Sequence, residues 1–357
     1  GEGGEVEVGR QLSAASVARA LITSSEGVMG AWAYEGLRPE HHKAGPENLT
    51  LWAGWVRRNI LLSELLSGIA YDRTSAGESI CLDYVTRHKN EGGELIHLIR
   101  PSEDVFADQL EYVRNYAALR LERSAEITVQ VQNILPFFAA VTLLHANRMR
   151  HTVELLEVLL NATIIVEQRV KHALACRRPI EYSPQIQPMI ETPGHGSLPS
   201  GHATEAFVLA LVLYALRCEA VSISDEKPKS ADREPKHDPW YEQLIRHAER
   251  IAINRTVAGV HFPVDSAAGM MLAQALADFY ILKCSSGGEA PTRKFDGTIF
   301  KGDFAYENVL RSSPPPDRPK RGRSSFKVRK SELLGQIWKA AVEEWRVAFR
   351  HGPATEA

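Results

Sequence analysis

The chain has 357 residues, of which 44% are apolar and 24% are charged, and its formal net charge is −2. This length allows one large domain or two ordinary ones, and the near-zero charge excludes a general attraction to nucleic acid or to anionic membranes. The composition is that of a water-soluble globular protein, so function has to be sought in local patterns.

Helical spacing of apolar residues is common along the chain, and runs of alternating β-branched residues are scarce. Apolar side chains recur at steps of one, three or four from Trp52 to Leu65 and from Leu155 to Val166, which is the pattern of a packed helix. The second pattern predicts a helix over 150–177. We expect it to end at Arg178-Pro179, because the residue before a proline is disfavoured in helical conformation. The fold class predicted is all-α.

Prolines and glycines indicate the next boundaries. Residues 180–198 contain several of both among polar residues and predict an irregular loop. A helix is predicted from Pro199-Ser200-Gly201 to about Val221. Residues 222–239 are charged and hold three prolines, which is typical of a solvated excursion between two helices.

Two further helices are predicted before Cys284. The first covers about 240–258 and is ended by Gly259. The second begins near Pro263, because proline suits the first turn of a helix.

The C-terminal part is expected to be less ordered. Residues 311–330 hold eight Lys or Arg and one Asp. Because Phe326 is the one aromatic residue there for base stacking, we favour an exposed linker over a nucleic-acid-binding arm. Residues 331–351 predict a helix that docks on the protein's own body or, as a homo-oligomer, on a second subunit. Its apolar stripe consists of Leu334, Ile337, Trp338, Ala341, Trp345 and Phe349.

The first of three segments with chemical character contains two cations. Lys171 and Arg178, followed by Pro179, are seven residues apart. On one continuous helix this spacing would place both side chains on the same face. Taken alone, the pair is better explained as a solvated basic stripe.

The second segment is Pro199-Ser200-Gly201-His202, directly before an apolar run. Serine is a preferred residue at a helix N-cap, and a helix start also directs free N–H groups at an anion. Gly201 allows close approach of the backbone because it has no Cβ. His202 would project from the first turn.

The third segment has the spacing R-x5-H-x3-D and consists of Arg255, His261 and Asp265. Within one helix, Asp265 could accept a hydrogen bond from one ring nitrogen of His261 and determine its tautomer. The other nitrogen would then be free to attack or to ligate. An isolated His–Asp pair is more often structural.

In this order, K-x6-R-P, P-S-G-H and R-x5-H-x3-D resemble the three-part signature of one superfamily. It joins type 2 phosphatidic acid phosphatases, bacterial non-specific acid phosphatases and vanadium-dependent haloperoxidases. The resemblance covers about Lys171 to Asp265, and Asn254 departs from it because the family usually has Ser there. The resemblance implies a helical bundle of the acid phosphatase/vanadium haloperoxidase type, with an anion pocket at the ends of several helices.

The resemblance also implies roles for the individual residues. His261, supported by Asp265, would bond to the central atom of a vanadate cofactor, or of a phosphate in the same site, and is therefore the expected metal ligand. His202 would act as acid or base on the opposite side. Three cations would neutralise the oxyanion: Lys171, Arg178 and Arg255. Two donors would form hydrogen bonds to it: Ser200 and the Gly201 N–H.

The same pocket would serve either of two reactions. In a phosphatase, His261 attacks phosphorus and His202 protonates the leaving alcohol of a soluble phosphomonoester. In a haloperoxidase, vanadate stays bound to His261 and acts as a Lewis acid while hydrogen peroxide oxidises a halide. A binding protein with a relic pocket is a third class, disfavoured because every chemical position is occupied.

His195 decides our preference between the two reactions. It lies five residues before Ser200, and the segment 194–204 resembles the vanadium bromoperoxidase pattern, in which a second histidine lies near the metal. The alternative is an ordinary polar loop residue, and the segment 259–263 is closer to the phosphatase version. We predict a vanadium-dependent haloperoxidase that oxidises bromide, with a soluble acid phosphatase as the alternative.

The domain prediction follows from the motifs. It comprises an N-terminal helical part that shapes the pocket (1–130), a catalytic bundle (131–285), and a basic linker with a docking helix (286–357). The apolar runs 134–146 and 206–216 are shorter than the roughly 20 residues of a membrane span, so we expect no such span. We also expect no signal peptide, and the location stays open between the cytoplasm and export after processing.

Overall fold

The computed structural model describes residues 15–28, 40–74, 76–142, 144–221, 238–312 and 325–350. Its contacts divide the chain into two compact units, residues 1–45 and 46–357. The first unit contains α2 (Ala15–Val28), and all other elements below belong to the second. The predicted boundaries near residues 130 and 285 stay a prediction.

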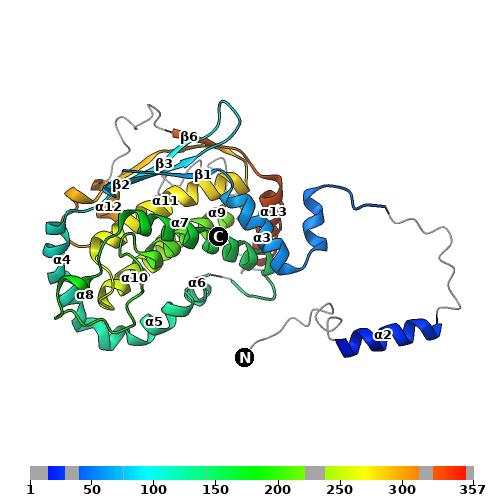
Figure 1. The fold of residues 1–357 in the computed structure, drawn as a ribbon, viewed down its shortest axis with the longest axis horizontal. Coiled ribbons are helices and arrows are strands. Elements are labelled where there is room, and N and C mark those ends of the chain that lie inside the picture. The colour runs from blue at the N-terminus through cyan, green and yellow to red at the C-terminus, as the bar shows by residue number, and fades with distance from the viewer. Residues whose placement is uncertain are drawn as a thin grey trace, which may run out of the picture. The chain divides into compact units, whose positions relative to one another are not determined.

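Four long helices form the centre of the second unit (Figure 1). Helices α9 (Gly201–Val221) and α11 (Pro263–Cys284) pack on each other and are buried along most of their length. Apolar residues occupy most positions on all sides of these two helices, and a helix that is apolar all round belongs inside a protein. Helices α7 (Arg150–Leu174) and α10 (Pro239–Val257) pack against α9. All four helices begin close to where the sequence predicts them, and α7 ends at Leu174, before the predicted end at 177.

Shorter elements surround this centre. Helix α5 packs along α10 and brings its C-terminal turn towards the start of α9. The elements are η2 (Pro46–Leu51), α3 (Gly54–Leu66), α4 (Glu103–Tyr116), η3 (Ala117–Leu119), α5 (Arg120–Gln132), α6 (Leu135–Val141), α8 (Pro179–Tyr182), η4 (Gly297–Ile299) and α12 (Tyr306–Ser312).

The prediction of an all-α fold was wrong in one respect, because the mostly helical unit also carries a small mixed sheet. Its strand order is β1 (Ile69–Arg73), β2 (Ser79–Tyr84), β3 (Gly93–Ile99) and β5 (Arg293–Asp296). The first three strands are antiparallel, and β5 joins β3 in parallel. A two-stranded ladder pairs β4 (Gly288–Pro291) with β6 (Ser325–Val328).

Burial explains why β2 shows no alternation of polar and apolar residues in the sequence. Every residue of β2 is buried, and a strand covered on both faces shows no alternation of polar and apolar residues. Figure 1 shows the sheet lying over α11, which contacts both β3 and β5. The partner strand β5 comes from the far end of the chain, so no local pattern near β3 announces the pairing.

The C-terminal helix α13 (Glu332–Arg350) docks on α7 and α9 of the same chain. Five residues of its predicted stripe are buried and Phe349 is partly buried. Trp338 Nε1 donates to Glu219 Oε2 at 2.8 Å, and Glu344 accepts the N–H groups of His151 and Thr152 at the start of α7. The stripe is thus covered by the protein's own body, so it no longer motivates a homo-oligomer.

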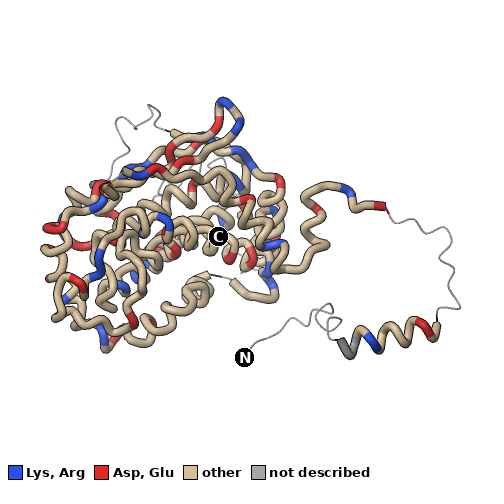
Figure 2. Tube along the Cα trace, in the orientation of Figure 1, with Lys and Arg blue, Asp and Glu red and all other residues tan. Residues whose placement is uncertain are grey.

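Two predicted segments fall largely outside the described residues. They are the charged excursion at 222–237 and the central part of the basic linker at 313–324. Figure 2 shows basic and acidic positions interleaved along the described elements. Among the described helices, none combines the length and apolarity that a membrane crossing requires.

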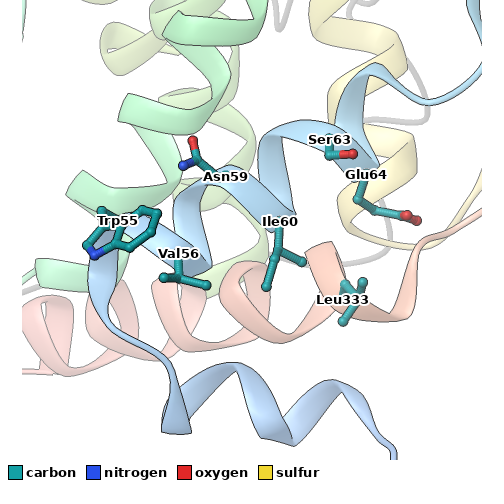
Figure 3. Close-up of a pocket in the computed structure, with 7 residues that line it drawn as sticks. All are labelled: Trp55, Val56, Asn59, Ile60, Ser63, Glu64 and Leu333. Carbon is teal, nitrogen blue, oxygen red and sulfur yellow. The ribbon is translucent and has the colours of Figure 1, made fainter.

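A groove of about 400 Å³ lies between α3 and α13. Figure 3 shows that α3 supplies most of its lining, including Trp55 and Ile60, and that Leu333 comes from α13. None of the residues that the motifs single out lines this groove.

Candidate active site

The first motif is built by a turn and not by one helix. Helix α7 ends at Leu174 because Ala175 adopts a left-handed conformation with φ of 49°. Arg178 lies beyond this turn in extended conformation (φ −81°, ψ 158°), as expected for a residue before proline. The prediction that Lys171 and Arg178 share one helix face was therefore wrong. Although the turn ends the helix between the two cations, both side chains still donate to the loop before α9.

Lys171 connects α7 to the loop before α9. Its side chain is 1% exposed, and Nζ donates to the carbonyl oxygens of Ser197 (3.3 Å) and Pro199. Burial lowers the pKa of Lys171 to about 8, although the nearby Glu167 carboxylate acts in the opposite direction. The ammonium group thus supports the loop from which the second motif begins.

The second motif opens α9 as predicted. Ser200 precedes the first helical residue, and its Oγ accepts a long hydrogen bond from the Ala203 N–H (3.4 Å). The first N–H groups of α9 have no acceptor within the helix. The Ser200 N–H donates to the backbone oxygen of Asp265 at 2.9 Å, which joins the second motif to the third.

His202 faces the C-terminal turn of α5. Its Nε2 donates to the backbone oxygen of Gln130 at 2.9 Å, because a carbonyl can only accept. In the neutral ring the lone pair is therefore on Nδ1. Burial, followed by the charge of Arg255, lowers the pKa of His202 to about 3. His202 is accordingly a neutral proton acceptor in this structure.

The third motif contains the predicted His–Asp hydrogen bond in a different setting. His261 precedes α11, and its Nδ1 lies 3.0 Å from Asp265 Oδ2. The same oxygen accepts the Phe262 N–H at 2.9 Å and the Ser197 hydroxyl. Asp265 therefore caps the start of α11 while it orients His261.

Arg178 defines the tautomer of His261. Its Nη1 lies 3.0 Å from His261 Nε2. A guanidinium group can only donate hydrogen bonds, so Nε2 carries the lone pair and Nδ1 donates its proton to Asp265. Burial, together with the charges of Arg178 and Lys171, holds the pKa of His261 well below its usual value. The result is a neutral imidazole whose lone pair lies on Nε2, where it accepts from Arg178 in this structure; a nucleophile or a metal ligand requires a lone pair at this nitrogen.

His195 lies beside the same guanidinium group. Arg178 Nε donates to the backbone oxygen of His195 at 3.1 Å, and Arg178 Nη2 lies 3.1 Å from His195 Nδ1. A further donation from Nη1 to the backbone oxygen of Val260 (2.8 Å) holds the segment before His261. The exposed His195 ring is thus part of the candidate site.

Arg255 presents donors that the protein itself does not use. The side chain is 1% exposed, and Nη2 donates to Gln130 Oε1 at 2.7 Å. Its Nε and Nη1 are buried and donate to no acceptor among the described residues. Burial lowers the pKa of Arg255 to about 10, so the group stays cationic at neutral pH. Buried N–H groups without acceptors are unfavourable, and an oxyanion would satisfy both.

The electrostatic interactions place the three motifs in one neighbourhood. The pKa of His261 is lowered by Lys171 and Arg178 of the first motif, by His202 of the second and by Arg255 of the third. Asn254, at the position where the family usually has Ser, donates its amide to Glu126 Oε2 and Gln130 Oε1 at 3.1 Å each. Two residues of α5 therefore accept the hydrogen bonds of the asparagine side chain.

Four residues in or beside the site were not predicted from the sequence. Glu205 offered a signal, because it is the one charged residue in the apolar run 203–216. Glu167 lies one turn before Lys171 beside an apolar stripe. Gln130 and Ser197 carry no local signal, because their partners are far away in the chain.

Comparison with known proteins relates part of the chain to one family. The profile of the PAP2 superfamily matches residues 151–283, the stretch that holds all three motifs, and this match supports membership of that superfamily. A search of curated proteins finds no match.

Proposed function

We propose that this PAP2 superfamily protein is a vanadium-dependent haloperoxidase that oxidises a halide, preferably bromide, with hydrogen peroxide. The observation that carries oxyanion binding is the pair of unused buried donors on Arg255. The contact between His195 and Arg178 favours the haloperoxidase, because the preference for that reaction rests on a second histidine near the site.

The residues present fit a vanadate cofactor. The expected donors are three cationic side chains, the Ser200 hydroxyl, the first N–H groups of α9 and the lone pair of His261 Nε2. When bound, vanadate would supply the Lewis acidity that activates peroxide. Asp265 holds the His261 ring, and the lone pair on His202 Nδ1 would accept a proton from hydrogen peroxide.

The alternative is a phosphomonoesterase, and the neutral His261 ring favours it as much as it favours vanadate binding. Nε2 would attack phosphorus, and the bond from phosphorus to the ester oxygen would break. The leaving alcohol then needs a proton from His202. Burial is the main cause of the low pKa of His202, and the charges of Arg255, Lys171 and Arg178 lower it further. A bound dianion would offset these charges and raise the pKa of His202 towards the range in which it acts as the acid.

A paired assay on one preparation separates the two functions. One half is stripped of vanadium and given p-nitrophenyl phosphate. The other half is loaded with orthovanadate and given hydrogen peroxide, bromide and a halogen-trapping dye. Bromination that requires both vanadate and peroxide supports the haloperoxidase. Rapid hydrolysis that vanadate inhibits, without bromination, identifies a phosphatase instead.

Replacing His195 with alanine tests the preference for the haloperoxidase. We expect bromide oxidation to fall by about tenfold while vanadate remains bound. His195 contacts Arg178, which is expected to bind the vanadate, and replacing a residue that supports a metal-binding group typically has an effect of this order. Dye bromination and vanadium content are measured together. His172→Ala, an exposed histidine on α7, is the matched control. Unchanged bromination in the His195 variant would remove our reason for preferring this reaction.

Replacing Arg255 with alanine tests the oxyanion site itself. The loss of two charge-assisted hydrogen bonds is expected to weaken the binding of phosphate or vanadate by about 100-fold or more. Arg246→Ala, an exposed arginine of the same helix paired with Glu242, should bind both anions normally. Equal affinities in the two variants, measured by calorimetry, would contradict the placement of the anion.

A further inference from the structure

Two carboxyl groups lie next to the candidate oxyanion pocket, where an anion-binding site would be expected to exclude them. Glu167 is on α7, one turn before Lys171, and Glu205 is on α9, one turn after Gly201. Glu167 is 3% exposed, whereas Glu205 keeps part of its side chain accessible. Residues four apart share a helix face. Both carboxyl groups therefore belong to the crossing of α7 and α9.

Glu167 makes direct contact with the start of α9. A Cβ added at Gly201 would overlap the carboxyl group of Glu167, whose Cδ lies 3.1 Å from that position. Glycine at residue 201 thus admits this side chain. Glu167 Oε2 is buried and has no hydrogen-bond partner among the described residues. A buried carboxylate oxygen without a partner is unfavourable. This arrangement favours the protonated, uncharged form of the Glu167 carboxyl group.

Charged groups from several elements face this acid pair. Lys171 and Arg178 interact with Glu167, and Lys171 and Arg255 interact with Glu205. The two carboxyl groups also repel each other. The Tyr280 hydroxyl of α11 is a further neighbour of Glu167. The three cations expected to bind the oxyanion are therefore also the counter-ions of the acid pair.

A bound oxyanion and an ionised acid pair would compete for the same cations. We propose that Glu167 and Glu205 form a charge-compensating pair that balances the pocket cations in the free protein and takes up a proton when a tetrahedral oxyanion binds. This inference rests on the proposed oxyanion site and holds for either reaction there. Burial raises the pKa of Glu167 to about 8 and that of Glu205 to about 7, so the exchange would occur near neutral pH.

The expected pH dependence follows from the sign of this linkage. Protonated carboxyl groups do not repel the oxyanion, and ionised ones do. Affinity should therefore be highest below the pH at which the pair ionises and should fall above it. If one proton is taken up per anion, the loss is about tenfold for each pH unit.

Calorimetry with tungstate tests the proposal on the full chain. Tungstate is a tetrahedral dianion throughout the neutral and alkaline range, so any proton taken up on binding goes to the protein. Titrations at about pH 8, where the pair is largely ionised in the free protein, are run in two buffers with different ionisation enthalpies and give the number of protons. We expect about one proton for the wild-type protein and about none for a variant that carries both Glu167→Gln and Glu205→Gln. That variant should also lose the alkaline fall in affinity.

Single variants and a control make the outcome decisive. Glu157→Gln, on the exposed face of α7 beside Arg58, should behave as wild type. If Glu167→Gln does not fold, Glu205→Gln and the wild-type pH profile still decide the question. Tungstate binding without proton uptake, or uptake unchanged in the glutamine variants, overturns the inference. Failure of the wild-type protein to bind tungstate at all would instead refute the oxyanion site of the proposed function.

Discussion

Replacing His261 with alanine is expected to lower either activity by about 10⁴-fold or more, the scale at which an essential nucleophile or ligand acts. Both mechanisms require a bond from Nε2 to the central atom of the oxyanion. The contacts of this ring leave its lone pair on Nε2, because Arg178 donates on that side and Asp265 accepts on the other. Steady-state rates in the paired assay measure the loss.

Two accompanying measurements identify the cause of that loss. His172→Ala controls for the removal of an imidazole from the surface and should keep full activity. Vanadate content should fall in the His261 variant, while the thermal unfolding midpoint shows whether the fold is preserved. A folded His261 variant that still turns over substrate would refute the assignment of the site.

Asp265→Asn is expected to lower activity by about 10⁴-fold, as replacement of the carboxylate does in other His–Asp pairs. The carboxylate oxygen Oδ2 accepts from His261, Phe262 and Ser197. An asparagine that turns its NH₂ group towards His261 would require Nδ1 to accept. The proton would then move to Nε2, where Arg178 already donates, and no lone pair would face the oxyanion.

Ser197→Ala is the matched control for this variant. It removes one donor to Asp265 without changing the tautomer of His261, so a much smaller loss of activity is expected. If both variants lose activity equally while remaining folded, the tautomer argument fails.

The pH profile offers a second check on Asp265. Burial raises its pKa to about 6, against the opposing effect of the Ser197 hydroxyl and the Phe262 N–H. Because the ionised form orients His261, the wild-type kcat/KM should fall as the pH drops below about 6. Asparagine does not titrate there, so this acid limb should be absent from the residual activity of Asp265→Asn.

The features that the sequence predicted correctly are those whose geometry arises within a few residues of chain. The start of α9 after Ser200 and the start of α11 at Pro263 follow from capping and proline, which act over a single helical turn. The His261–Asp265 hydrogen bond is equally local. The apolar run 206–216 likewise lies within a buried helix, α9, because a helix buried on all sides carries apolar residues at most of its positions.

The positions of Lys171 and Arg178 relative to each other could not be predicted from the local sequence. A left-handed residue at Ala175 ends α7 early, and alanine carries no signal for that conformation. The sheet escaped for a similar reason, since β3 pairs with a strand from the far end of the chain. Hydrophobic periodicity reports which face of an element is buried, and it does not report which distant segment covers it.

The sequence by itself therefore determined the superfamily signature, the long helices and the residues of the three motifs. Only the tertiary structure decided how these residues meet, and it added Gln130 on α5 and the acid pair at the α7–α9 crossing. Gly201 shows the difference most clearly. Its missing Cβ predicted close approach of the backbone to a ligand, and the structure places the carboxyl group of Glu167 in that space. The physical reason is that capping and backbone preferences act within one turn, whereas burial and charge compensation depend on segments that packing alone brings together.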